Sequence, residues 1–70
     1  MPTSGMELKL ARVRESATLT ELAAQVGLSR QALWATERAA MVDAERVRAY
    51  LDGLAALRAA KLAREKEDAA

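Results

Sequence analysis

The stretch that most constrains the fold runs from Thr18 to Arg38, where two helical segments meet at a tight turn. Thr18 and Glu21 have the spacing of a capping box, which predicts that a helix starts here. Gly27 suits the left-handed conformation that ends a helix, and Ser29 offers a hydroxyl to cap the next one. The predicted helices are Thr18–Val26 and Ser29–Arg38.

Apolar residues surround this corner, and small Ala23 stands where the two helices must approach. Taken residue by residue, ELAAQVGLSRQALWATER resembles the helix-turn-helix of the lambda-repressor/Cro family of bacterial and phage regulators. The wider resemblance runs from about Leu8 to Leu54. It implies an all-α domain of four to five helices that binds double-stranded DNA. The alternative interpretation is an ordinary two-helix corner in a small bundle.

The chain departs from the family at several positions. The link Glu15–Ala17 lacks the Gly and the apolar residue that the family often has there. Leu19 stands where the family tends to have Gln, so that contact is not carried over. Thr36 replaces a residue that is usually apolar. Glu37–Arg38 does match the Glu-Arg with which many of these helices end.

The second helix of the pair has a polar face suited to DNA. At about 100° per residue, its polar and aromatic side chains share an arc of roughly 100°, opposite Leu33. These side chains are Arg30, Gln31, Trp34 and Arg38. Arg pairs with guanine and Gln with adenine in the major groove, and apolar groups contact the thymine methyl. The pattern therefore predicts base contacts from Arg30, Gln31 and Trp34.

Further side chains are suited to the DNA backbone, because hydroxyl, guanidinium and ammonium groups donate hydrogen bonds to phosphates. The expected backbone contacts are Thr18, Ser29, Arg38, Arg12 and Arg14. For Arg12 and Arg14, which share the first helix with Lys9, a solvated face is an equally good interpretation.

The first helix is predicted to begin near Gly5, because Ser4 and Glu7 have capping-box spacing. Its expected buried face is formed by Met6, Leu10 and Val13.

The C-terminal part predicts a further helix that extends beyond the region of resemblance. Asp43 can cap it, and Gly53 either ends it or lies inside one long helix. The extension, residues 54–70, carries a leucine stripe expected to form a dimer interface, namely Leu54, Leu57 and Leu62. In the alternative interpretation, the first two of these fold back onto the first helix. The last residues, 65–70, are expected to be poorly ordered.

Composition argues against other classes of protein. The chain has 70 residues, which suits a single domain, and it contains no Cys and no His. The usual catalytic bases, soft nucleophiles and metal ligands are therefore missing, and we expect no enzyme, metal or cofactor. No small-molecule ligand is evident. No apolar run approaches the length of a membrane span and the N-terminus lacks a signal pattern, so a cytoplasmic protein is expected.

The net charge of +1 is small for a nucleic-acid binder, so adequate affinity is expected to need two copies of the domain. The sequence thus predicts a transcriptional regulator, a small repressor of phage, plasmid or bacterial origin, that binds an inverted repeat as a homodimer. Two alternatives remain open. One is a helical protein-interaction module, such as an adaptor or antitoxin part. The other is a DNA-binding accessory factor for excision, packaging or partition.

Overall fold

The structure, a computed structural model, describes residues 3–69 and consists of helices joined by short links. The four helices are α1 (Gly5–Arg14), α2 (Leu19–Val26), α3 (Arg30–Arg38) and α4 (Ala44–Ala69). Within residues 3–69 there is no β-strand, only an isolated bridge between Thr3 and Val42. The all-α prediction is confirmed, with four helices. None of them, over the described residues, is long and apolar enough to cross a membrane.

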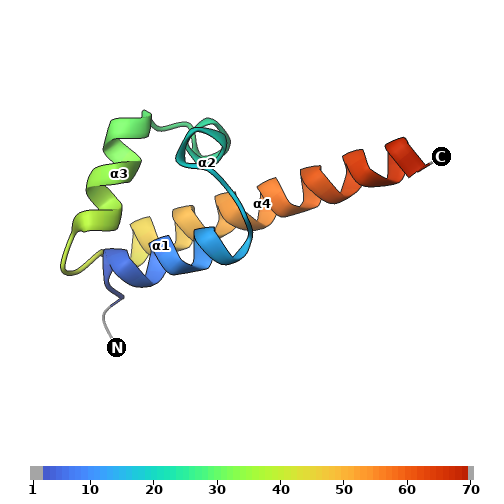
Figure 1. Cartoon of the computed structure of the whole chain (residues 1–70). Helices are drawn as coiled ribbons and strands as arrows, with labels where there is room; N and C mark the ends of the chain where they lie inside the picture. Colours follow the sequence, from blue (N-terminus) through green and yellow to red (C-terminus); the bar gives the residue numbers. More distant parts are fainter. Residues whose placement is uncertain (1–2, 70) are drawn as a thin grey trace.

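The first three helices gather around the N-terminal half of α4, and the C-terminal half of α4 projects beyond them (Figure 1). Gly53 therefore lies inside one long helix. It is needed there because α2 crosses closely: a Cβ at Gly53 would lie 2.5 Å from Val26 Cγ2. The helix continues through Ala69, and residue 70, the last of the residues expected to be poorly ordered, lies outside the described part of the chain.

The predicted caps are present. The hydroxyl of Thr18 accepts from the Glu21 N–H at 3.1 Å, and the Glu21 carboxylate accepts from the Thr18 N–H at 3.0 Å. Gly27 has a φ of 81°, the left-handed conformation expected of it. Ser29 Oγ accepts from the Ala32 N–H at 3.1 Å. Local side-chain chemistry therefore sets where α2 and α3 start.

The link between α1 and α2 contains a residue with a left-handed backbone, Ser16. Ser16 has a φ of 56°, a conformation that costs energy for a residue with a Cβ. The next residue, Ala17, is buried in the core.

The buried face of α1 differs from the prediction. Met6, Leu10 and Val13 are each roughly half exposed, whereas Gly5 and Leu8 are buried. Both sides of this helix carry apolar residues, so its periodicity alone does not choose between them. The close approach of α1 to α3 decides the matter, because the Gly5 N–H donates to the Ala39 carbonyl at 2.9 Å.

Two of the three leucines predicted at a dimer interface belong to the protein's own core. Leu54 and Leu57 are only 7% and 5% exposed, so neither can contact a second copy. They pack in one cluster with Leu8, Leu22 and Tyr50. Of the predicted stripe only Leu62 remains at the surface, where it is 50% exposed.

Candidate nucleic-acid interface

The side chains predicted to contact DNA lie on the outer surface of α3. Arg30, Gln31, Trp34 and Arg38 are all exposed. On the opposite side Leu33 is buried and holds the helix against the core. The turn formed by Gly27, Leu28 and Ser29 separates this helix from α2. Four polar or aromatic groups are therefore presented together at the surface.

Glu37 is the single acidic residue of α3, and it is buried. Its carboxylate accepts from Arg12 twice, with the guanidinium Nε 2.8 Å from Oε2 and Nη2 3.0 Å from Oε1. Tyr50 of α4 donates its hydroxyl to Oε2 at 2.6 Å. The exposed face of α3 consequently carries no carboxylate that would repel a phosphate backbone.

Arg12 is therefore not a phosphate contact. Its side chain is 11% exposed, and its remaining Nη1 donates to the Ala17 carbonyl at 2.9 Å. The hydrogen bond that it donates to Glu37 raises the pKa of the Arg12 guanidinium. Burial, followed by the hydrogen bond to Glu37, raises the pKa of the Tyr50 hydroxyl. These three side chains join α1, α3 and α4, and the prediction for Arg12 is corrected to a structural one.

The sequence contained one unused signal for this cluster. Glu37 follows Leu33 by four positions and so lies on the same, buried face of α3. A carboxylate on a buried face needs donors, because an unpaired buried charge is costly. Nothing local in the sequence identifies Arg12, twenty-five residues earlier, as the partner.

Trp34 and Arg38 interact on the outer face of α3. The guanidinium carbon of Arg38 lies 4.7 Å from the centroid of the Trp34 ring, a cation–π arrangement. Trp34 remains 50% exposed, so its ring is covered on one side only. The stacking holds the Arg38 guanidinium near the middle of α3.

A surface hollow of about 640 Å³ runs between α1 and α3. Met6 and Lys9 line it from α1, and Arg30, Trp34 and Arg38 line it from α3. Lys9 is thus brought beside the exposed cations of α3. Arg14, at the far end of α1, is exposed but does not line this hollow.

The two hydroxyls predicted to contact the DNA backbone are both used as helix caps. Thr18 and Ser29 are exposed, and each oxygen accepts from a backbone N–H. Each hydroxyl still has its own hydrogen to donate. A phosphate oxygen could accept from both without breaking either cap.

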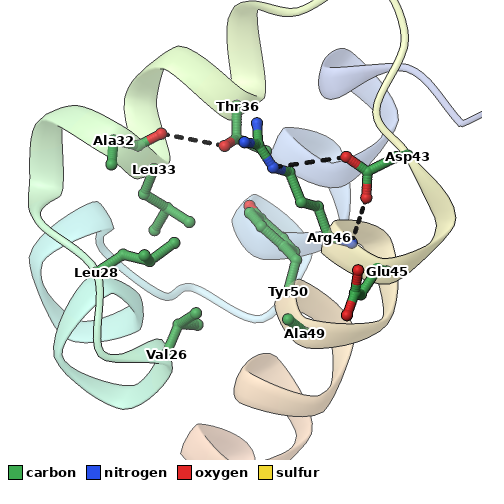
Figure 2. Close-up of a pocket in the computed structure, with 10 residues that line it drawn as sticks. All are labelled: Val26, Leu28, Ala32, Leu33, Thr36, Asp43, Glu45, Arg46, Ala49 and Tyr50. Atoms are coloured by element: carbon green, nitrogen blue, oxygen red, sulfur yellow. Dashed lines mark hydrogen bonds and ion pairs between the residues drawn. The ribbon is translucent and has the colours of Figure 1, made fainter.

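A second hollow, of about 550 Å³, lies on the other flank of α3 and reaches α4 (Figure 2). Leu33 and Tyr50 are the buried residues that line it. Thr36 also lines it, and its hydroxyl donates to the Ala32 carbonyl at 3.0 Å. Asp43 and Arg46 form an exposed ion pair of 3.5 Å beside it. No buried charge lines this hollow, so it offers little specificity for a small polar ligand.

Over residues 3–69, no group of three acidic, His or Cys side chains is placed to hold a metal ion. Comparison of the chain with models of protein families, with curated proteins and with solved structures gives no match.

Proposed function

We propose that the protein binds double-stranded DNA through a helix-turn-helix formed by α2 and α3, and that it acts as a cytoplasmic transcriptional regulator of the lambda-repressor/Cro type. The observation that supports this most is the outer face of α3. It presents Arg30, Gln31, Trp34 and Arg38 while the helix's one acid is buried and neutralised. Helices that only face solvent usually mix acidic and basic residues, so a surface made of donors alone favours an anionic partner.

In this proposal the N-terminal end of α3 enters the major groove. Arg30 and Gln31 lie in its first turn, where they can reach base edges. Trp34, one turn further, packs against a thymine methyl or a sugar. Arg38 contacts the backbone beside it. The cap hydroxyls of Thr18 and Ser29 add phosphate contacts.

Cations of α1 extend the backbone contacts. Lys9 takes the place that the sequence assigned to Arg12. Both residues line the hollow with the α3 cations, but Lys9 is exposed whereas Arg12 is paired with Glu37. Arg14 is exposed and contributes to the electrostatic attraction at longer range. Since the net charge is only +1, two copies bind an inverted repeat together, with half-sites roughly 34 Å apart or a multiple of that distance. Repression is the regulatory effect we propose.

The test is DNA binding measured by fluorescence anisotropy, with an operator obtained by selection from random duplexes. Arg30→Ala or Gln31→Ala should cost about 1–3 kcal/mol on the operator and much less on unrelated DNA. Arg38→Ala should weaken binding to both and reduce the salt dependence. Arg64→Ala, which removes an equal charge from the projecting part of α4, is the matched control. A wild-type protein that selects no sequence and binds no duplex would refute the proposal.

A second candidate function is a protein-interaction module, and the exposed apolar stripe of α1 favours it. Met6, Leu10 and Val13 follow at helical spacing and are each roughly half exposed. In that case substitution of Leu10 by Asp would abolish capture of a partner protein and leave DNA binding unchanged. The anisotropy experiment separates the two functions, because only the first requires Arg30 and Gln31.

A further inference from the structure

One side of α4 carries exposed apolar residues in both halves of the helix, and the C-terminal half projects from the body of the protein (Figure 1). Leu51 and Leu62 are 44% and 50% exposed. Between them lies Ala55, also exposed. We call these three residues the α4 stripe. At about 100° per residue they share one side of the helix and form a strip for a partner helix. Arg58 lies on the same side between Ala55 and Leu62, with its guanidinium 3.8 Å from the Glu15 carboxylate.

We propose that the α4 stripe is covered by the same helix of a second copy of this chain, paired antiparallel over the full length of α4. This inference deepens the dimer of the proposed function. It rests on α4 alone, however, and not on any contact with DNA.

The apolar contacts follow from a register that pairs the two ends of the helix, Ala44 with Ala69. In this register Leu51 faces the partner's Leu62, and the twofold symmetry gives the same contact twice. Ala55 faces the partner's Arg58. Because Ala55 is small, the aliphatic stem of that arginine can lie across it while the guanidinium stays in water.

The charges complement one another in the same register. Arg48 faces the partner's Glu65, and symmetry again doubles the pair. Glu45 lies on the flank of the stripe within about one turn of the partner's Lys66. All four side chains are exposed in the single chain and are free to reach across.

A parallel pairing would reverse this complementarity. It would place Arg48, Arg58 and Glu65 each beside the same residue of the partner. Like charges directly across a helix pair destabilise it. The charge pattern of α4 therefore favours the antiparallel arrangement.

The proposed interface is separate from the α3 surface. Tyr50, Gly53 and Leu57, which pack against the other helices, lie about 150° around α4 from the stripe. None of α3 is needed to form the dimer. The outer faces of both α3 helices thus stay accessible.

The first test is sedimentation velocity without DNA, over a range of protein concentrations. The wild type should dimerise, and Arg48→Glu or Glu65→Arg should each raise the dimer dissociation constant about tenfold or more. The double variant should restore the wild-type value. Glu67→Arg, the same charge change on the same helix but off the stripe, should have no effect. Circular dichroism checks that each variant retains its helix content.

A monomeric wild type at all concentrations would overturn the proposal. So would single variants that dimerise as well as the wild type, or a double variant that dimerises no better than the single ones. A protein that dimerises as expected but binds no DNA would refute only the proposed function.

The second test fixes the direction of the pairing. The chain has no Cys, so Glu67→Cys supplies a single site for a spin label. In the antiparallel register residue 67 lies at the same height along the helix pair as the partner's Arg46, although both point away from the stripe. At about 1.5 Å per residue, the two labels are then about 30 Å apart along the helix. A parallel pair would bring them within about 8–10 Å plus the label lengths. Pulsed electron paramagnetic resonance distinguishes the two, and the short distance would overturn the antiparallel pairing.

Discussion

Replacement of Glu37 by Gln tests how strongly the three-residue cluster holds the domain together. Gln has nearly the same shape as Glu but carries no charge. Its NH2 group, a donor, replaces one of the two acceptor oxygens of the carboxylate. The Glu37 side chain is 4% exposed, so water cannot replace what is lost. Arg12 would keep its buried charge, with the bidentate bonds of 2.8 and 3.0 Å broken. Tyr50 would compete with Arg12 for the one remaining oxygen.

The expected loss of stability is about 3 kcal/mol, at the lower end of the range for breaking a buried ion pair, because Arg12 is 11% exposed. A domain of 70 residues has a total free energy of unfolding of about 4–10 kcal/mol. The single change should therefore remove between a third and most of the stability. The double variant Arg12→Met, Glu37→Leu leaves no buried charge. The Tyr50 hydroxyl then loses its acceptor and the Ala17 carbonyl loses the Arg12 donor, each at about 1–3 kcal/mol.

Urea unfolding followed by circular dichroism measures these differences. The loss of stability in the double variant should be smaller than the sum of the losses in its two component variants, Arg12→Met and Glu37→Leu. The reason is that the two side chains interact directly, so their contributions are not additive. Asp43→Asn is the matched control. It neutralises an exposed carboxylate paired with Arg46 while keeping a capping group, so its cost should be below about 1 kcal/mol. If Glu37→Gln costs no more than this control, the cluster does not stabilise the fold as argued.

Three further predictions concern single positions. Ser16→Gly should raise the free energy of unfolding by about 0.5–1 kcal/mol in urea titrations, because glycine adopts a φ of 56° without strain, whereas Ser16→Ala should not. The hydrogen bond from the Thr18 N–H lowers the pKa of the Glu21 carboxyl below its usual 4.5. The contribution of Glu21 to the free energy of unfolding is therefore fully present above pH 4.5, and it is lost as the pH falls through the lowered folded-state pKa. Glu21→Gln should therefore reduce the acid-side loss of stability in thermal melts recorded from pH 6 to pH 2. Trp34→Ala should leave the melting temperature nearly unchanged, since the ring is 50% exposed, and should weaken binding to the selected operator; a drop of many degrees would place the ring in the core.

Features set by neighbouring residues could be predicted from the sequence. The caps at Thr18 and Ser29 and the left-handed Gly27 depend on residues within three positions, and all are present. The buried face of α1 could not be predicted in this way, because Leu8 on one side and Leu10 on the other are equally apolar. Only the approach of α3 to Gly5 selects between them, and that contact joins residues more than thirty positions apart.

The partner of a buried charge is equally non-local. Arg12 carries the guanidinium group expected of a phosphate contact, but its side chain is largely buried. What decides is the carboxylate of Glu37, twenty-five residues away. The same reasoning applies to Leu54 and Leu57, which continue the spacing of Leu62 but are buried in the core with Leu8 and Leu22.

The Arg12–Glu37–Tyr50 cluster also links the two proposals made for this protein. Tyr50 lies on α4, the helix proposed to form the dimer, and Glu37 lies on α3, the helix proposed to read DNA. In a symmetric dimer, the distance between the two α3 helices depends on how rigidly each is held to its own α4. A flexible connection would allow many operator spacings, whereas a short hydrogen bond and a bidentate ion pair favour one. The buried acid would then have two effects, because it removes a repulsive charge from the DNA face and fixes the angle at which that face is presented.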